Sequence, residues 1–419
     1  MELTRTTGGT LGHCAALYGL AVLARLASLL ALGISGPLIE DEPQYFEPAK
    51  YLADGQGYCK VPQQSPDGIA QPSAYRMPGP ALLLAAVFVV CGPSIEVARV
   101  TCLLVASASA PLMYLVARRL SVHPVPIVAS VACALYPSWV YYSHYALSEP
   151  VYIPALLFAL LVSDLAFRSG SDRQLFLCGL VWGLAVLVRP HALPVGGLIA
   201  LWGAWSLGFR KGGLLLAGMA LVLAPWVVRN QVQLGHPVLL ATEGGETLLG
   251  SNNPYVVDDP NLWGMWVSPT RVPEYEERLR GVQDEVERDR VQNQLGMGFL
   301  KENPGAIPGL VVHKLWRWLT PVTASGGRNR VLVLCSYGVL LVALAVGALR
   351  GTFARSRLLM FAGIVTAVSV LITAVYWGAL TRGRLPVEMT WLPWGALALS
   401  EVGMVIVRRL VGPAASPRR

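Results

Sequence analysis

Charged residues are scarce in this chain. Only 14% of its 419 residues are Asp, Glu, Lys or Arg, whereas 54% are hydrophobic. This composition excludes an ordinary water-soluble domain and is typical of a protein with several membrane-spanning helices. The net charge is +8, but the basic residues lie in short, separate loops and form no continuous stripe. In a membrane protein such an excess usually marks cytoplasmic loops. We therefore expect membrane lipids around the chain and no nucleic-acid partner.

Motifs for metals and cofactors are also missing. The six histidines form no i,i+4 pair, the seven cysteines form no CxxC pair, and there is no Walker A, GxSxG or HExxH motif. Most cysteines, such as Cys102 and Cys178, lie within apolar runs, where they are small core residues. The residues therefore support no metal site and no certain cofactor, and a divalent metal is an option without a ligand pattern.

Apolar runs make up most of the remaining sequence. Ten are long enough to cross a bilayer as helices, whereas the run Gly79–Val90 is short for a crossing. If Gly79–Val90 lies at the membrane surface or re-enters, the basic residues of every short turn fall on one side, which the positive-inside rule makes cytoplasmic. Both termini are then cytoplasmic as well. The ten expected spans are residues 11–35, 97–117, 124–142, 150–167, 174–190, 192–209, 212–228, 330–349, 357–378 and 387–407.

This arrangement leaves two long regions outside. In the second, Glu274–Leu300 is charged and has helical periodicity, and Ile307–Leu319 carries two tryptophans, as expected of a helix at the membrane surface. The first outer region covers residues 36–96 and the second 230–328. We accordingly divide the chain into a membrane module that includes the first outer region (1–229), the second outer region (230–328), and C-terminal membrane helices with a short cytoplasmic tail (329–419).

Three carboxylates, Glu40, Asp41 and Glu42, follow directly on the first apolar run. Charged side chains at a bilayer boundary carry a free-energy cost and often have a function, which makes this stretch a candidate catalytic region. The alternative is that the acids are solvated, or that they cap the helix predicted over Pro43–Ala53. Because Glu42 stands at the cap position and Glu40 nearest the lipid, Asp41 has the most freedom to face inward as a general base.

Other polar residues also gather on the outer side. Glu149, in Ser148-Glu149-Pro150, either caps a helix or orients a substrate. The outer arginines oppose the positive-inside trend, and they either extend to lipid headgroups or bind a lipid-linked phosphate, for which the guanidinium fork is suited. These arginines are Arg189, in Arg189-Pro190-His191, then Arg229, Arg382 and Arg384.

These motifs together resemble the glycosyltransferase-C superfamily of integral membrane glycosyltransferases. The likeness is strongest to its protein O-mannosyltransferase and lipid A aminoarabinose transferase branch. It extends over nearly the whole chain, because the motifs occur in the same order. The segments that carry it are Asp41–Glu47 (Asp-Glu-x-x-Tyr-x-Glu), Ser148–Pro150, Ala224–Asn230, Gly250–Pro254, Asn303–Lys314 and Arg382–Pro386.

The resemblance implies an all-α polytopic membrane fold with about ten transmembrane helices and interfacial helices in the first outer region. It also implies an enzyme that transfers a hexose or pentose from a polyprenyl-phosphate-linked donor to a lipid, glycan or protein, outside the bacterial plasma membrane. A single displacement would invert the anomeric centre. The implied residues are Asp41, Glu42 and Glu149 for catalysis; Arg382, Arg384 and, more weakly, Arg229 for the donor phosphate; and Tyr45, Arg76, Arg189, His191, Asn230 and Asn252 for substrate binding.

The chain departs from the aminoarabinose transferase branch at Tyr75-Arg76-Met77-Pro78, where that branch has Glu-Lys-Pro. The glutamate linked there to metal binding is therefore missing. Two alternative functions stay open. An oligosaccharyltransferase or ligase with a pyrophosphate-linked donor would favour a divalent metal. A flippase or transporter of lipid-linked sugars would place charges mid-membrane along a path between repeats, whereas here they cluster at one face.

Overall fold

The computed structural model of the protein describes residues 2–61, 68–121, 124–320, 328–353, 356–376 and 381–411. The described chain is helical almost throughout, as expected where apolar segments must satisfy their backbone polar groups without water. The strands in these ranges, β1 (Cys59–Lys60) and β2 (Gln71–Pro72), form one short antiparallel pair with Cys59 opposite Pro72. The predicted all-α polytopic fold class is confirmed.

Helices occupy all ten ranges that the apolar runs predict to be spans. Within the described residues, six helical segments are long and apolar enough to cross a bilayer. The protein is therefore an integral membrane protein. The helices in these ranges are α1 (Glu2–Leu32), α4 (Ile95–Ser107) with α5 (Ser109–Ala117), α6 (Val125–Leu135) with α7 (Pro137–Tyr142), α8 (Glu149–Ser169), α9 (Asp172–Val188), α10 (Ala192–Leu207), α11 (Phe209–Leu234), α17 (Arg328–Val333) with the π-helical turn η3 (Leu334–Gly338) and α18 (Val339–Leu349), α19 (Arg357–Val375) and α20 (Leu385–Val411).

Small residues let the membrane helices approach one another closely. A Cβ added at Gly179 of α9 would lie 2.1 Å from the carbonyl oxygen of Leu215 in α11, and one at Gly218 would lie 2.4 Å from that of Phe176. Glycine is therefore required at both positions, as in many membrane helix pairs. These contacts hold the first halves of α9 and α11 together.

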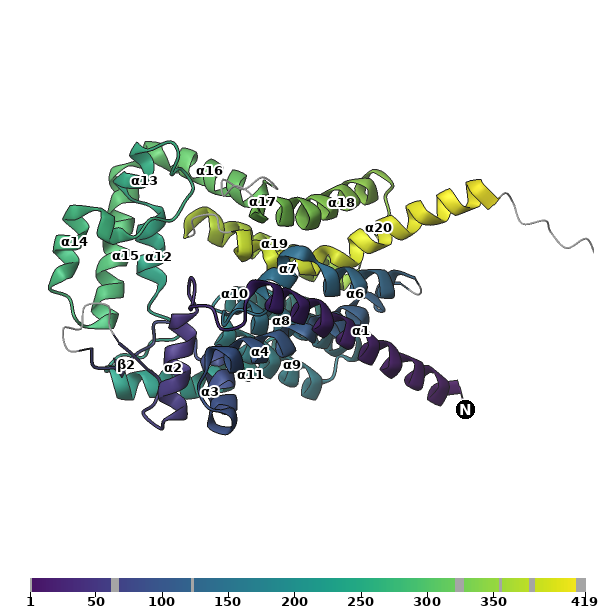
Figure 1. Ribbon diagram of the computed structural model, residues 1–419, viewed down its shortest axis with the longest axis horizontal. Coiled ribbons are helices and arrows are strands. Elements are labelled where there is room, and N and C mark those ends of the chain that lie inside the picture. The colour runs from purple at the N-terminus through teal and green to yellow at the C-terminus, as the bar shows by residue number, and fades with distance from the viewer. Residues whose placement is uncertain are drawn as a thin grey trace, which may run out of the picture.

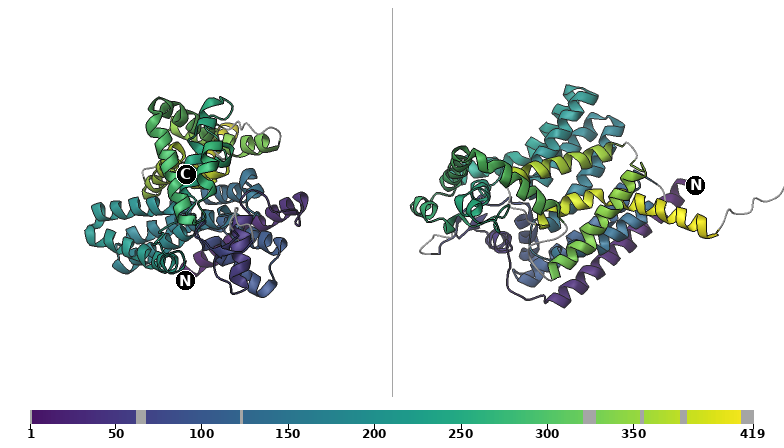
Figure 2. Two further views of the ribbon diagram at one scale, coloured as in Figure 1. Left: turned by 90° about the vertical axis from the view of Figure 1, so that its left-hand side faces the viewer. Right: turned by 90° about the horizontal axis from the view of Figure 1, so that it is seen from above.

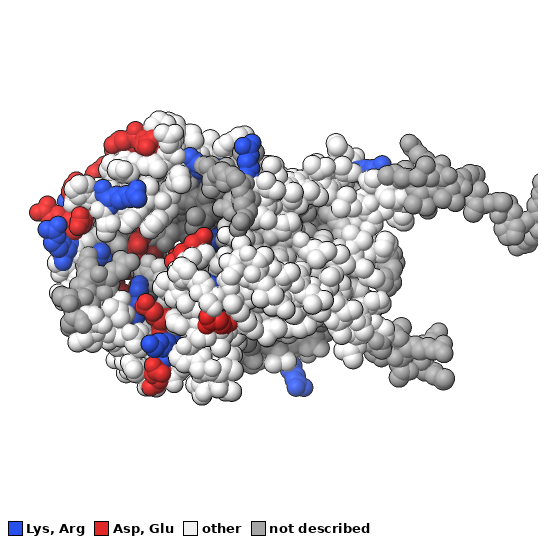
Figure 3. All heavy atoms as spheres, viewed as in Figure 1, with Lys and Arg blue, Asp and Glu red and all other residues white. Residues whose placement is uncertain are grey.

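The second outer region forms one end of the molecule. In Figure 1 it lies opposite the beginning of α1 and the end of α20, and Figure 2 shows the same separation from above. On the face drawn in Figure 3, charged side chains gather over this end, whereas the body of membrane helices is almost free of them. The outer elements are α2 (Pro43–Ala53), α3 (Gly79–Cys91), α12 (Gly244–Ser251), α13 (Pro254–Asp258), η1 (Pro269–Arg271), α14 (Pro273–Arg280), α15 (Glu285–Glu302), η2 (Pro304–Ala306), α16 (Ile307–Leu319) and η4 (Thr381–Arg384).

Two details of the outer regions differ from the sequence expectation. The stretch Glu274–Leu300 is not one helix but two, α14 and α15, because Asp284 starts a new helix by accepting a hydrogen bond from the backbone N–H of Glu287 at 2.7 Å. Helix α2 begins at Pro43 as predicted, but the Glu42 side chain does not cap it. Helix α3 has 13 residues, too few to cross the hydrocarbon core.

Candidate active site

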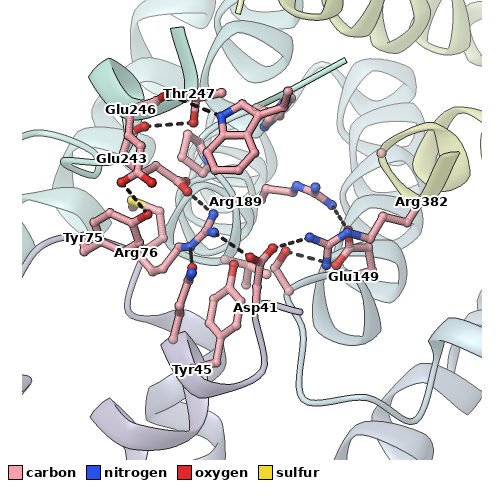
Figure 4. Close-up of a pocket in the computed structure, with 18 residues that line it drawn as sticks. Asp41, Tyr45, Tyr75, Arg76, Glu149, Arg189, Glu243, Glu246, Thr247 and Arg382 are labelled. Atoms are coloured by element: carbon pink, nitrogen blue, oxygen red, sulfur yellow. Dashed lines mark hydrogen bonds and ion pairs between the residues drawn. The ribbon is translucent and has the colours of Figure 1, made fainter. Parts of the chain in front are cut away.

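The main pocket lies where the outer ends of the membrane helices meet the outer regions (Figure 4). Its volume is about 160 Å³. Its walls come from segments that are far apart in the sequence: the loop before α2 with the first turn of that helix, the segment before α3, the beginning of α8, the end of α9 with the loop after it, the beginning of α12, the loop before η1, and η4. Only the folded chain therefore brings these residues together.

Asp41 lies between two arginines in this pocket. Its carboxylate forms an ion pair with Arg76 at 3.3 Å and another with Arg382 (Figure 4). Burial raises the pKa of Asp41, but the positive charges of Arg76 and Arg382 outweigh burial and bring the pKa below its usual value. Asp41 is therefore ionised at neutral pH, in the form that can accept a proton.

A second ion pair lies beside the first. Glu149, the first residue of α8, is buried and lies 3.1 Å from Arg189, which follows the end of α9. Burial by itself lowers the pKa of Arg382, but the nearby carboxylates of Glu149, Asp41 and Glu40 raise it above the usual value. Arg382 thus stays charged in a partly dry pocket, where it can attract an anion strongly.

The opposite end of the pocket is lined by carboxylates, hydroxyls and aromatic rings. Glu243 pairs with Arg76, and the Tyr75 hydroxyl donates to Glu246 at 3.0 Å. Trp266 also lines this end. Figure 4 shows Arg382 and Glu149 on one side, Glu243 and Glu246 on the other, and Asp41 between them. The pocket can therefore hold an anion at one end and a hydroxyl-bearing group at the other, with an ionised carboxylate between.

The structure brings together seven of the residues proposed from the sequence. It also adds residues of the second outer region that sequence reasoning missed, although the two acids of Glu243-Gly-Gly-Glu246 at the start of a helix were a usable signal. The proposed residues that line the pocket are Asp41, Tyr45, Arg76, Glu149, Arg189, His191 and Arg382, and the missed ones include Gln44, Glu243, Glu246, Thr247 and Trp266.

Glu42 does not belong to this pocket. Its side chain is fully buried and pairs with Arg99 of α4 at 2.9 Å. Its carboxylate also accepts hydrogen bonds from the backbone N–H groups of Ile39, at 2.8 Å, and Ala146, at 2.9 Å. Its proposed catalytic role is therefore withdrawn, because a carboxylate with all these partners is occupied in holding the loop to the membrane helices.

Arg384 also faces away from the main pocket. It pairs with Glu388 at 2.6 Å, donates to the carbonyl oxygens of Trp318 and Thr320, and lies over the Tyr337 ring at 3.5 Å. It lines a separate, small cavity that also contains Glu388. Of the two arginines of the one-turn helix η4, Arg382 lines the main pocket and Arg384 the separate cavity.

Three further proposed residues have structural partners instead. Arg229 donates to the carbonyl oxygens of Ser73 at 2.6 Å and Tyr58 at 2.5 Å. Asn230 donates to Val238 O, and Asn252 donates to Leu248 O and Val375 O while accepting from Lys314. None of the three lines the main pocket. They fasten loops to helix ends, a role that polar residues in loops commonly have.

Within the described ranges, no three His, Cys, Asp or Glu side chains are placed to hold a metal ion. The two glutamates at the acidic end are already engaged, Glu243 by Arg76 and Glu246 by Tyr75.

The sequence profile of the family described as dolichyl-phosphate-mannose-protein mannosyltransferase matches residues 71–228. None of the curated proteins is detectably similar. Among solved structures, the archaeal oligosaccharyltransferase AglB from Archaeoglobus fulgidus, in complex with an inhibitory peptide and a dolichol-phosphate, is similar over 99% of this chain, with a TM-score of 0.54 and 14% identity. The chain has the glycosyltransferase-C fold. It spans 53% of the length of AglB.

Two structures of ArnT from Cupriavidus metallidurans are also similar to this chain. ArnT from Cupriavidus metallidurans bound to undecaprenyl phosphate matches 97% of this chain and 81% of its own, with a TM-score of 0.44 and 14% identity. Its apo form matches 97% and 80%, with a TM-score of 0.41 and 15% identity. Within the glycosyltransferase-C fold of this chain, the matched family segment includes Arg76, Glu149 and Arg189, whereas Asp41 and Arg382 lie outside it.

Proposed function

We propose that this protein is an inverting glycosyltransferase that moves a sugar from a polyprenyl-phosphate-linked donor to an acceptor hydroxyl at the extracytoplasmic membrane face. The observation that carries this proposal is the position of Asp41, an ionised carboxylate between Arg76 and Arg382 in a pocket at the outer ends of the membrane helices. A base next to fixed positive charge is what this transfer requires.

Arg382 and Arg189 are assigned to the donor phosphate. The phosphate leaves with the electron pair of the broken anomeric bond, and fixed guanidinium groups stabilise the charge that develops on it. Both arginines are largely buried, and both are ion-paired with carboxylates of the pocket. A phosphate that takes over one of these pairs keeps the arginine neutralised, while the displaced carboxylate loses part of its stabilisation.

Asp41 is assigned as the base. Its pKa is held below the usual value by Arg76 and Arg382 after burial has raised it. When the donor phosphate competes for Arg382, Asp41 loses part of that stabilisation, and its pKa rises toward that of a more effective base. The acceptor oxygen then bonds to the anomeric carbon, its proton moves to Asp41, and polyprenyl phosphate departs. One displacement inverts the anomeric configuration.

The location follows from the arrangement of charge and helix ends. Helices α2 and α12, which contribute residues to the pocket, lie at the end of the molecule opposite the start of α1 and the end of α20 (Figure 1). The basic turn Arg118-Arg119 follows α5, and by the positive-inside rule it belongs in the cytoplasm. We therefore propose a bacterial plasma membrane location, with the pocket outside and both termini inside. The similarity to the dolichyl-phosphate-mannose-protein mannosyltransferase family and to AglB, whose structure contains a dolichol-phosphate, supports a polyprenyl-phosphate donor.

The test is donor consumption by the purified protein in lipid vesicles. Radiolabelled undecaprenyl-phosphate and dolichyl-phosphate sugars are supplied with a membrane extract as the acceptor source, and label in non-donor products is measured. We expect transfer with inverted anomeric configuration, read by NMR of the product. Retained configuration would contradict the single displacement, and no consumption of any lipid-phosphate sugar would contradict the proposed function.

An oligosaccharyltransferase with a pyrophosphate-linked donor is the second candidate, because the fold resembles that of AglB. A pyrophosphate leaving group carries more charge and would favour a divalent metal. The same assay with a lipid-pyrophosphate donor, with and without EDTA, separates the two candidates. Metal-dependent transfer from the pyrophosphate donor alone would favour the oligosaccharyltransferase.

A further inference from the structure

A second polar cavity adjoins the main pocket. Its volume is about 80 Å³, and it lies between the β1–β2 pair, α12 and α15. Tyr75 and Glu246 line both cavities. The hydrogen bond from the Tyr75 hydroxyl to Glu246, at 3.0 Å, therefore forms part of the wall between them. The two cavities therefore adjoin at this pair of side chains.

The carboxylates of the second cavity are occupied by the protein itself. Glu285 accepts hydrogen bonds from Ser73 Oγ at 2.6 Å, Ala74 N at 2.8 Å and Thr242 Oγ1 at 2.6 Å. Asp289 accepts from the backbone N–H of Gly245 at 2.6 Å. These bonds fasten the segment before α3 to α12 and α15. The carboxylates thus shape the cavity and leave its other polar groups to meet a ligand.

Gln292 of α15 is such a group. The residue is only 4% exposed, and its side chain lines the second cavity. An amide in such a lining can both donate a hydrogen bond to a ligand and accept one from it. Lys60, on the opposite wall, lies with Nζ 3.5 Å above the Tyr75 ring and forms no ion pair within the described chain. An amide, an ammonium group and an aromatic ring face thus border the space.

We infer that the second cavity binds the next sugar unit of a carbohydrate acceptor whose terminal sugar lies beside Asp41. This inference rests on the proposed transferase function. An amide both donates to and accepts from hydroxyl groups, and an ammonium group donates to them, so this lining is complementary to a sugar ring. Tyr75 lines both cavities and therefore lies between the two sugar positions.

The lining argues against the other acceptor classes. Among the described residues that line the cavity, none is a large aliphatic side chain, so a lipid chain would gain little burial there. A peptide that added to a sheet edge would need several free main-chain groups. The described β1–β2 pair is only two residues long on each strand. The acceptor that best fits the two adjoining cavities is a glycan of at least two sugar units.

The test begins with the class of product. Wild-type protein in vesicles is supplied with radiolabelled undecaprenyl-phosphate or dolichyl-phosphate sugar and membrane extract, and the products are separated into glycan, protease-released peptide and simple lipid. We expect the label in glycan. Label confined to peptide or to sugar-free lipid acceptors would overturn the inference while leaving the transferase function intact. A wild-type protein that consumes no donor would instead overturn the proposed function and this inference with it.

The second step uses the labelled glycan fraction, in its unlabelled form, as the acceptor for variants. Gln292→Met removes the amide at similar volume, and Gln292→Ala removes it by truncation. Gln294→Ala is the matched control, because Gln294 is exposed on the same helix and does not line this cavity. We expect both Gln292 variants to raise the KM for the glycan about three- to tenfold, the worth of one or two hydrogen bonds. The donor KM and the kcat should stay unchanged, and Gln294→Ala should match wild type. An unchanged glycan KM in folded Gln292→Met would overturn the inference.

Discussion

Asp41 and Arg382 are 341 positions apart in the chain, and their side chains form an ion pair inside the main pocket. Asp41 belongs to the first outer region, and Arg382 to the short helix η4 just before the last membrane helix. The pocket is thus complete only after α20 has packed against the rest of the bundle. This ion pair joins the proposed base to the arginine that we propose binds the donor phosphate. Each side chain therefore stabilises the charged form of the other.

The first prediction concerns Asp41. Asp41→Asn keeps the shape of the side chain and removes the proton acceptor, so turnover should fall about 10²–10⁴-fold. Binding of polyprenyl phosphate should be retained or tightened, because Arg76 and Arg382 lose a competing carboxylate. The measurement is turnover and lipid-phosphate binding on purified protein. Asp54→Asn, at the exposed end of α2, is the control and should behave as wild type. Normal turnover in Asp41→Asn would show that another residue is the base, and Glu149 would then be the next candidate.

The second prediction separates the two arginines of η4. Arg382→Lys keeps the charge but loses the planar fork, and it should weaken binding of radiolabelled polyprenyl phosphate about ten- to a hundredfold. Arg384→Ala should leave the affinity of the folded fraction unchanged, because Arg384 is engaged by Glu388 outside the main pocket. It should instead lower the yield of folded protein. Equal losses of affinity in both variants would show that the two arginines share the ligand.

The third prediction concerns Glu42. Glu42→Gln leaves the buried guanidinium of Arg99 without its charged partner, and removing one member of a buried pair typically costs about 3–5 kcal/mol of stability. The thermal unfolding midpoint should therefore fall, while the folded fraction keeps its turnover per molecule. Glu47→Gln is a suitable control, since Glu47 forms no ion pair within the described residues. A catalytic loss in Glu42→Gln without any change in stability would restore Glu42 as a catalytic candidate.

The fourth prediction is a pH dependence of stability. Lys314 of α16 is fully buried and donates to Asn252 Oδ1 at 2.8 Å and to Val375 O at 3.1 Å, at the end of α19. Burial lowers its pKa from 10.5 to about 7. Between these two values the unfolded chain binds more protons than the folded chain, so stability rises as the pH increases from about 7 toward 10.5. Below about 7 this lysine is protonated in both states and contributes no slope.

Lys314→Met should remove this rise, measured as the change in thermal midpoint between pH 7 and pH 9 in detergent. Lys301→Met is the control, because Lys301 is exposed near the end of α15 and should leave the rise in place. The same slope in Lys314→Met and in wild type would show that another group is responsible.

The sequence by itself determined the class of fold and about half of the site. Long apolar runs have few ways to satisfy their backbone groups in lipid, so the ten helical ranges could be read directly. Helix α2 could also be placed residue by residue, because Pro43 starts it and Asp54-Gly55 ends it. Asp41, Glu149, Arg189 and Arg382 were named because charged residues at the outer membrane boundary are few, and Arg76 was named from the family resemblance.

Only the tertiary structure decided which charged groups face the pocket and which serve as supports. Asp41 and Glu42 are adjacent, and Arg382 and Arg384 lie two positions apart in η4. In each pair one side chain lines the pocket while the other is taken by a buried partner. That choice depends on Arg99, which helix packing brings to Glu42, and on Trp318 and Tyr337, which it brings to Arg384. Likewise, Glu246 and Gln292 gain their place beside Tyr75 only when α12 and α15 fold over the first outer region. Local sequence specifies the helices, but the burial of one charge against another is a property of the assembled chain.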